Sequence, residues 1–454
     1  MFIIGPPGCG KSAVWKTLAR ANKHIGLDTE FDCLDPKAVP TNALYGMLTK
    51  SKEFKNGVLS TIIRNQCKET GKYKPHHKMK WSILDGDIDP NWIESLNTVM
   101  DDNKMMTLVS NDRFPLTDSM KLLFEISNLK HATLATVTRA GGLYIIVSDI
   151  GWKPFCDSWI EKHRPEVIQA EKDAGLHPMR PEFDQLAVSV FLKCQTYIEN
   201  QDIQRLTHAC PTVDIMLIET TCTIIDDLVA RNKKELASKK EEELKVAYEG
   251  IFLYAGMWGI GGTFLESGED EQHFKQFCKM WKGQSKIKFP EAKLGERRQT
   301  IFDFYFDVKS LSWAKWEPSK FEIPDEISFT RLFVPTLYTE RLRDLLDLHV
   351  RHKKPILFMG NAGTGKTALI NQYLDNLRSD DYAKTVINFS SKTTSKSLQN
   401  NIMCSGLSKL GMRLYGLGSG RTMVLFVDDI NMPRTDEFGT QSPIALMRQI
   451  IDYG

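Results

Sequence analysis

The stretch Gly5-Pro-Pro-Gly-Cys-Gly-Lys11-Ser12 decides the fold of this chain. It matches the pattern G-x-x-x-x-G-K-[ST], in which glycines let backbone N–H groups close around a phosphate. The lysine supplies positive charge, and the hydroxyl that follows it reaches a Mg²⁺ ion. An apolar run, Phe2–Ile4, precedes the pattern, and helix-compatible residues 13–21 follow it. The stretch therefore predicts a strand, a phosphate-binding loop and a helix, in that order.

A second match, Gly360-Asn-Ala-Gly-Thr-Gly-Lys366-Thr367, occurs much later in the chain. It too follows an apolar run, Ile356–Met359, and precedes helix-compatible residues 368–377. Two matches in this context predict two successive modules that bind ATP or ADP with Mg²⁺. The predicted phosphate-binding residues are Gly5, Gly8, Gly10, Lys11 and Ser12 in the first loop and Gly360, Gly363, Gly365, Lys366 and Thr367 in the second, with Ser12 and Thr367 also binding Mg²⁺.

A phosphate loop needs an acidic residue at the end of a neighbouring strand to hold Mg²⁺, and usually a second carboxylate that activates water. In the first module the apolar run 81–84 ends at Asp85, which we expect to bind Mg²⁺. Gly86 stands where the activating carboxylate is expected, and Asp87 lies beyond the predicted strand end. We therefore expect the first pocket to bind nucleotide and to hold it without hydrolysis.

In the second module the apolar run Val424–Val427 ends at two acids, Asp428 and Asp429. We expect Asp428 to bind Mg²⁺ through water. Asp429 stands where a glutamate is more usual, and it is the candidate catalytic base of this site. Its side chain is one methylene shorter, and a misplacement of about 1 Å can cost about a hundredfold in rate. Hydrolysis at the second site therefore stays open.

Composition indicates an ordinary soluble protein and limits the partners. The 59 Lys and Arg residues nearly balance the 57 Asp and Glu residues, so net charge favours neither nucleic acid nor a membrane as a partner. The nine cysteines are scattered without a C-x-x-C pair, which argues against a zinc site and against a disulfide framework. No apolar stretch is long enough to span a bilayer. These features predict a protein of the cytoplasm.

The order of patterns predicts an α/β fold made of tandem modules, each a parallel sheet with flanking helices, with a helical small domain between them. Strand-like runs at Phe2–Ile4, Lys80–Leu84 and Ala132–Val137 alternate with helical stretches. Apolar residues at three- and four-residue steps within 183–191 and 213–228 predict helices. The predicted boundaries are 1–152 for the first large subdomain, 153–300 for the helical lid, 301–325 for a hairpin or linker, and 326–454 for the second large subdomain.

Longer stretches resemble one family. The segment Trp81–Lys104, followed by Ala132–Arg139, is similar to the second AAA+ module of dynein heavy chains. The segment Val334–Arg341, the second phosphate loop and Phe426–Pro433 resemble the third module, and the sequence Asp-Asp-Ile-Asn-Met-Pro is similar to axonemal rather than cytoplasmic dyneins. The resemblance extends over essentially the whole chain. Because the first loop starts four residues into the chain, we expect a fragment or a short isoform.

The resemblance implies a role in a motor ring. Val334, Pro335 and Thr336 would contact the adenine of the second pocket, and Arg139 would be an arginine finger that acts on the preceding module, or else form a plain salt bridge. The two sites, with ATP or ADP and Mg²⁺, would regulate how hydrolysis elsewhere in the ring is coupled to microtubule-based ciliary motility. The implied partners are the remaining ring modules and, indirectly, microtubules and other dynein subunits. The implied location is the cytoskeleton of the cilium, the axoneme.

Two alternatives remain at this point. One is an independent tandem AAA+ remodelling ATPase, which Gly86 and the predicted hairpin within 301–325, with Trp313 and Trp316, disfavour. The other is a structural scaffold in which neither pocket hydrolyses ATP. The whole protein implied by the resemblance is a microtubule motor ATPase, whereas we expect this segment to be weakly active or inactive by itself.

Overall fold

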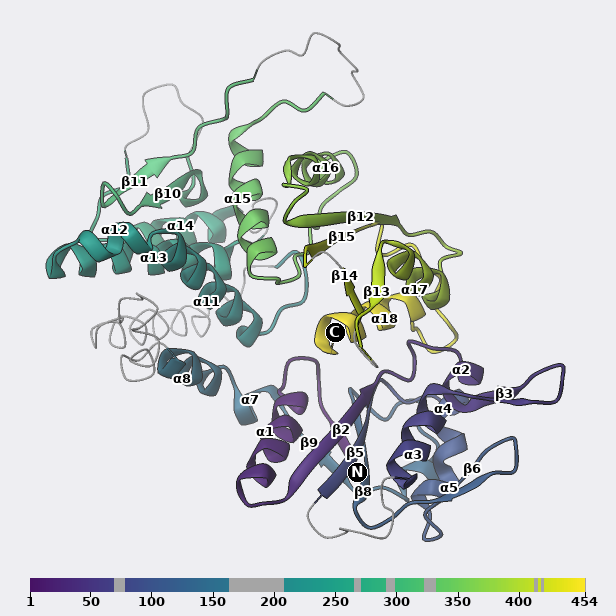
Figure 1. Ribbon diagram of the computed structural model, residues 1–454. Coiled ribbons are helices and arrows are strands. Elements are labelled where there is room, and N and C mark those ends of the chain that lie inside the picture. Colours follow the sequence, from purple (N-terminus) through teal and green to yellow (C-terminus); the bar gives the residue numbers. More distant parts are fainter. Residues whose placement is uncertain are drawn as a thin grey trace. The chain divides into compact units, whose positions relative to one another are not determined.

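A computed structural model describes residues 1–68, 78–162, 208–264, 271–290, 299–321, 332–411, 415–417 and 420–453. The chain forms two compact units (Figure 1). One consists of Met1–Ile150 with Arg378–Gly454, and the other of Gly151–Leu377. Among the described residues, no helix is both long enough and apolar enough to cross a membrane.

The first unit contains a five-stranded parallel sheet with the order β2-β5-β8-β1-β9. The phosphate-loop strand β1 (Phe2–Ile4) lies between β8 and β9 and pairs in parallel with both. Helix α1 (Lys11–His24) follows the loop and packs along β2 (Figure 1). The predicted strand 80–84 is confirmed as part of β5. The other strands of the sheet are β2 (Asp28–Leu34), β5 (Lys78–Asp85), β8 (Met120–Ile126) and β9 (Gly142–Tyr144).

Successive side chains of a strand point to opposite faces of the sheet, so residues of one strand report on both faces. Buried clusters cover both faces of this sheet. Phe2 belongs to one buried cluster, together with Leu84 and Phe124, and Ile3 belongs to another, together with Ile83. Short helices and two hairpins complete this part: α2 (Thr41–Tyr45), α3 (Val58–Lys68), α4 (Pro90–Ile93), the 3₁₀ turn η1 (Glu94–Leu96), α5 (Asn97–Met100), α6 (Leu134–Val137), α7 (Val147–Ile150), β3 (Gly46–Leu48) with β4 (Phe54–Asn56), and β6 (Met105–Thr107) with β7 (Arg113–Pro115).

The predicted strand at Ala132–Val137 is wrong. Residues 134–137 form helix α6 instead, and the Leu134 side chain is 79% exposed, so the run lacks the buried face of a central strand. The strand that pairs with β1 and β5 is β8, Met120–Ile126, whose apolar run contains an acid, Glu125. That acid interrupts the apolar pattern, although the residue is buried.

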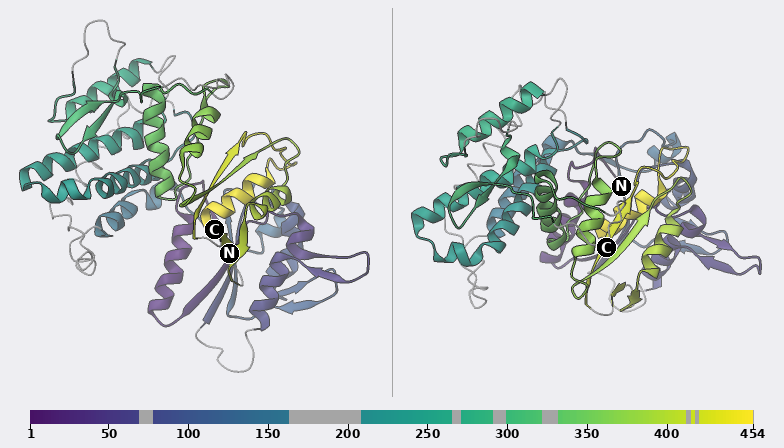
Figure 2. Two further views of the ribbon diagram at one scale, coloured as in Figure 1. Left: turned by 45° about the horizontal axis from the view of Figure 1, so that its top comes forward. Right: turned by 90° about the horizontal axis from the view of Figure 1, so that it is seen from above.

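Residues 378–454 repeat part of the same plan. Strand β12 (Tyr382–Asn388) pairs in parallel with β15 (Thr422–Asp428), as β2 pairs with β5. Helices α17 (Ser395–Cys404) and α18 (Ser442–Tyr453) pack on this pair through Leu398 and Leu446 (Figure 2). A short hairpin joins β13 (Leu407–Lys409) and β14 (Tyr415–Leu417).

The predicted strand Ile356–Met359 is not formed in the structure. Leu357 is 61% exposed and Met359 is 50% exposed. The equivalent strand of the first module, β1, is held by β8 and β9, which follow β5 in the sequence. Within the described residues after β15, the chain contains α18 and no further strand. The part of the chain that the structure describes therefore holds no equivalent of the two strands that pair with β1.

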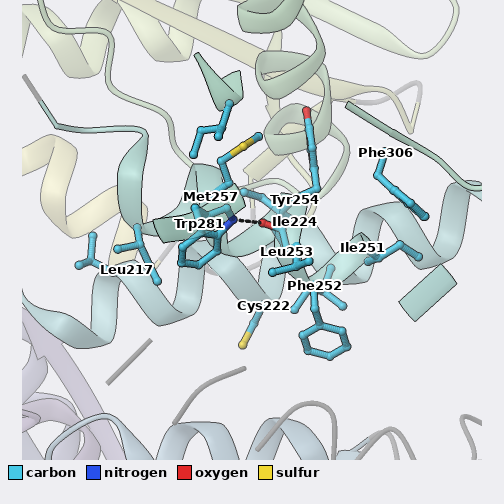
Figure 3. Packing of buried hydrophobic residues seen from close by; sticks show 14 of the residues in the cluster. Leu217, Cys222, Ile224, Ile251, Phe252, Leu253, Tyr254, Met257, Trp281 and Phe306 are labelled. Carbon is cyan, nitrogen blue, oxygen red and sulfur yellow. Dashed lines mark hydrogen bonds between the residues drawn. The ribbon is translucent and has the colours of Figure 1, made fainter. Parts of the chain in front are cut away.

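The second unit is mainly helical and is built around α13 (Glu241–Gly261). This helix is buried on nearly all sides, as expected for a central helix. The Trp281 indole donates a hydrogen bond to the Leu253 carbonyl at 3.0 Å (Figure 3). Strands β10 and β11 pair in antiparallel fashion, so the predicted hairpin is present. The other elements are α8 (Lys153–Lys162), α11 (Asp214–Arg231), α12 (Lys233–Ser238), α14 (Glu271–Gln284), η4 (Ile301–Asp303), β10 (Phe304–Asp307), β11 (Ser312–Lys315), α15 (Leu337–Arg351) and α16 (Lys366–Asn376).

The predicted helix within 213–228 is confirmed by α11, which buries Leu217, Ile224 and Ile225. The predicted helical residues 183–191 lie outside the described residues.

The close contact between Gly250 of α13 and Phe306 of β10 gives a stability prediction. A Cβ atom at Gly250 would lie 2.3 Å from the Phe306 ring, so Gly250→Ala should destabilise this unit by about 1–3 kcal/mol through overpacking. At a contact as short as 2.3 Å the cost should lie in the upper part of that range, above the gain in helix propensity of about 1 kcal/mol. The matched control is Gly283→Ala in α14, where a Cβ meets nothing within 4 Å and stability should be unchanged or higher. Hydrogen exchange of the α13 amides measures the difference. Equal protection in the two variants would contradict the packing argument.

Candidate nucleotide sites

The first phosphate loop has the backbone shape that its glycines allow. Gly8 and Gly10 adopt φ angles of 78° and 94°, in the left-handed region that favours glycine. Gly10 is the N-cap of α1 and supplies no side-chain cap, so the first N–H groups of the helix face the loop without a side-chain acceptor from the cap. At Gly5 a Cβ atom would lie 2.2 Å from the Ile145 carbonyl oxygen. The loop therefore has the tight cradle that fits a phosphate.

The cation of this cradle is Lys11. Its Nζ donates hydrogen bonds to the backbone oxygens of Gly5 at 2.8 Å and Pro6 at 3.0 Å. The ammonium group therefore lies over the loop, where it would meet the charge of a bound phosphate.

The parallel sheet brings two carboxylates to the same edge as this loop. Asp85 ends β5 and is directly opposite Glu125 of β8, and both are buried, at 5% and 6% exposure. Glu125 Oε1 accepts a hydrogen bond from the Ser12 hydroxyl at 2.6 Å, and its Oε2 accepts one from the Trp15 indole at 2.9 Å. Burial raises the pKa of Glu125, and the neighbouring Asp85 charge raises it further. The Ser12 hydroxyl and the Asp85 carboxylate are oxygen donors of the kind that Mg²⁺ prefers, and Glu125 accepts the hydroxyl proton of Ser12.

The sequence predicted Asp85 but missed Glu125. The signal was present, because an acid inside the apolar run 120–126 is unusual in a strand buried on both faces. Such a residue is retained where its charge is used or satisfied.

The Asp85 carboxylate also contacts α18. It forms an ion pair with Arg448 and accepts a hydrogen bond from the Tyr453 hydroxyl at 2.9 Å. The Gln449 side chain accepts a hydrogen bond from the Asp35 backbone N–H at 3.0 Å. Three side chains of one helix therefore reach the edge of the sheet that carries the first nucleotide site.

Gly86 stands at the predicted position of the activating carboxylate, and its surroundings leave little room for a side chain. A Cβ atom there would lie 2.7 Å from Asp35 Oδ1 and 3.0 Å from Pro36 Cδ. Burial raises the pKa of Asp35 to about 7. Asp87 is engaged elsewhere, because its Oδ1 accepts hydrogen bonds from the Ser127 backbone at 2.8 Å and the Ser127 hydroxyl at 2.6 Å.

Arg139 follows α6 and forms an ion pair with Asp101. Its side chain is 32% exposed. The plain salt bridge expected as one of its two roles is therefore present. Action as an arginine finger on another module stays a prediction.

The second phosphate loop repeats the geometry of the first. Gly363 and Gly365 have φ angles of 78° and 85°, and Gly365 is the N-cap of α16, again without a side-chain cap. Lys366 Nζ donates to the Gly360 oxygen at 2.8 Å and to the Asn361 oxygen at 2.7 Å. Thr367 is the second residue of α16, as Ser12 is of α1.

The predicted acidic residues of the second module belong to the compact unit that contains Met1–Ile150. Asp428 ends β15, and its Oδ1 accepts a hydrogen bond from the Asp429 backbone N–H at 3.0 Å. Asp429 is exposed and has a φ angle of 55°, a left-handed conformation in which aspartate is enriched relative to most residues. The backbone turns sharply at the predicted base.

The predicted adenine-contacting residues precede α15 in the helical unit. Thr336 is the N-cap of this helix, and its hydroxyl accepts a hydrogen bond from the Thr339 backbone N–H at 3.2 Å. Val334 is 52% exposed, and Pro335 lies between the two. Helix α15 packs on α16, where the Tyr373 hydroxyl donates to Asp347 at 3.0 Å. Val334, Pro335 and Thr336 therefore lead into α15, which packs beside α16, the helix that follows the second phosphate loop.

Comparison with known proteins agrees with this architecture along the chain. Residues 1–135 match a family described as AAA domain (dynein-related subfamily), residues 184–318 match the dynein heavy chain AAA lid domain, and residues 321–454 match the P-loop containing dynein motor region. The whole chain is 37% identical to the flagellar outer arm dynein beta chain of Chlamydomonas reinhardtii and to axonemal dynein heavy chain 17 of Mus musculus. It belongs to the axonemal dynein heavy chains.

Every residue of this dynein chain is covered in these comparisons, and the ciliary dynein beta chain of Heliocidaris crassispina is 38% identical over the same length. The chain spans 9% of the Chlamydomonas relative and 10% of the mouse relative. The family confirms the predicted fold class, tandem α/β P-loop modules with a helical lid between them. The independent remodelling ATPase is therefore not retained.

Lys11 gives the first prediction about the dynein nucleotide sites. Lys11→Ala should abolish nucleotide binding at the first pocket, because the phosphate charge would lose its only ammonium group in the loop pattern. Binding is measured with a photoreactive ATP analogue in a motor domain that carries this segment, with Lys366→Ala to silence the second site. The matched control is Lys23→Ala, in the last turn of α1. Undiminished labelling of the first loop in the Lys11 variant would contradict the assignment.

Proposed function

We propose that this chain contributes two regulatory nucleotide sites to the ATPase ring of an axonemal dynein heavy chain. The first pocket binds ATP with Mg²⁺ and holds it unhydrolysed. The second binds ATP or ADP and exchanges it or turns it over slowly. Their occupancy biases how hydrolysis at another module is coupled to microtubule-based movement in the cilium.

The observation that carries the proposal for the first pocket is the packing around Gly86. A carboxylate that orients the attacking water is a standard part of hydrolysis by phosphate-loop enzymes. Here the position has no side chain, and Asp35 and Pro36 fill the space that one would occupy. The Lys11 ammonium nevertheless lies over the loop, which supports binding of a phosphate there. Binding without turnover is the outcome that this combination supports.

The proposal for the second pocket rests on Asp429. Its position after β15 is that of the activating carboxylate, but its shorter side chain and left-handed backbone differ from those of a glutamate in an extended strand end. Loss of a well-positioned base slows proton transfer by about 10²–10⁴-fold. Slow turnover, rather than complete absence of turnover, is therefore proposed for this site.

The contact between α18 and Asp85 supports a regulatory coupling. Arg448 and Tyr453 belong to the segment that matches the P-loop containing dynein motor region, whereas Asp85 belongs to the segment that matches the dynein-related AAA domain. Binding of Mg²⁺ beside Asp85 would change the charge that Arg448 meets, so occupancy of one site would alter a contact made by the next module. That differential contact is what an allosteric effect requires.

Nucleotide retained in the first pocket provides the test. After loading with ATP and removal of free nucleotide, a motor domain carrying Lys366→Ala should retain mostly ATP in this pocket, with hydrolysis about 10²–10⁴-fold slower than at a site with a positioned base. Acid quench and chromatography of the bound nucleotide measure the ratio of ATP to ADP.

The control is Gly86→Glu in the same background. Because a Cβ atom at this position would meet Asp35 and Pro36, the added carboxylate should not produce turnover. Mostly ADP in the first pocket of the Lys366→Ala protein would contradict the proposal that this pocket holds ATP. Fast ATP hydrolysis gained by Gly86→Glu would show that space at this position is not the obstacle.

A further inference from the structure

Glu125 is the group of the first site that neither the phosphate-loop pattern nor the proposed function uses. It lies on β8, one strand away from Asp85 and one strand away from the loop strand β1. A carboxylate that is 6% exposed is costly unless hydrogen bonds satisfy it. Its two oxygens each accept one, from Ser12 and from Trp15. Both donors are on α1, the helix that begins at the phosphate loop.

We infer that Glu125 is a positioning residue for Mg²⁺ in the first nucleotide site, acting through the Ser12 hydroxyl. A serine hydroxyl has one proton and two lone pairs, and the proton rotates to suit its partner. When the proton is donated to Glu125 at 2.6 Å, the lone pairs are left for a cation. This inference rests on the proposed function, because it concerns Mg²⁺ that accompanies the bound nucleotide.

The same contacts favour this positioning role of Glu125 over that of a catalytic base. A base that activates water must have an oxygen directed at that water. Here Oε1 is held by Ser12, at the second residue of α1, and Oε2 is held by the buried Trp15 indole, three residues further on. The carboxylate is thus fixed against the helix that carries the loop. It does not replace the missing group at Gly86.

A nearby second acid strengthens the case for a cation. Glu125 lies opposite Asp85 in the β5–β8 register, and two buried acids in adjacent positions repel each other when both are charged. Arg448 already pairs with Asp85, and a divalent cation beside the loop hydroxyl would reduce the remaining repulsion. Carboxylates that hydrogen-bond a metal ligand typically change metal affinity by about 10–100-fold.

The test is a Mg²⁺ titration of nucleotide binding in a motor domain carrying Lys366→Ala. Glu125→Gln should raise the Mg²⁺ concentration needed for half-maximal binding about 10–100-fold. Binding of nucleotide in EDTA should be retained, because Lys11 and the loop backbone are unchanged. The matched control is Trp15→Phe, which removes the other hydrogen bond of Glu125 and leaves Ser12 in place. Its Mg²⁺ requirement should rise by less than the about 10-fold that is the smallest rise expected for the Glu125 variant.

A double-mutant cycle separates action through Ser12 from a general structural effect. Ser12→Ala should raise the Mg²⁺ requirement, and adding Glu125→Gln to it should produce no further rise. An unchanged Mg²⁺ requirement in Glu125→Gln, or an equal rise with and without Ser12, would overturn the inference. If Glu125→Gln fails to fold, Glu125→Asp applies the same test, because it keeps the charge but withdraws it from Ser12. Absence of nucleotide binding in the parent protein would instead contradict the proposed function.

Discussion

The placement of β1 between β8 and β9 is the constraint on which the first nucleotide site depends. Because all the pairs in this sheet are parallel, the strands end at one edge, and the phosphate loop, Asp85 and Glu125 meet there. Both faces of β1 are buried, so the loop starts from a rigid base. Lys11 and Ser12 then take their positions from the first turn of α1. The chemistry that we propose for the site follows from this edge, where the phosphate loop meets two acids and where Asp35 and Pro36 crowd Gly86.

In the second module the phosphate loop forms although the strand before it does not. Strands β12 and β15 pair in parallel as β2 and β5 do. In the second loop, as in the first, the lysine donates hydrogen bonds to backbone oxygens of its own loop. The loop conformation is therefore a local property of the glycine pattern. The strand before it is not local, because Ile356–Met359 needs neighbours on both sides, and the described residues after β15 supply no strand.

Much of the first site could be predicted from the sequence because its parts are local or periodic. The loop, the strand that ends at Asp85 and the gap at Gly86 are each visible within about ten residues. Glu125 was missed because its role depends on strand order, which places β8 beside both β1 and β5. The run 132–137 was mistaken for this strand because its composition suits either state, and burial decides between them. The contact of Arg448 with Asp85 joins residues far apart in the sequence, and no local pattern encodes it.

The central claim is that the first pocket is built to hold a nucleotide triphosphate, and the most direct measurement is a high-resolution structure. It requires an axonemal dynein motor domain that carries this segment, incubated with ATP and Mg²⁺ long enough for other sites to turn over. The account predicts an intact triphosphate in the first loop, with Mg²⁺ bound to the Ser12 hydroxyl and Glu125 still accepting the hydroxyl proton. An ADP molecule in that loop, or a water held by a carboxylate beside the terminal phosphate, would contradict it.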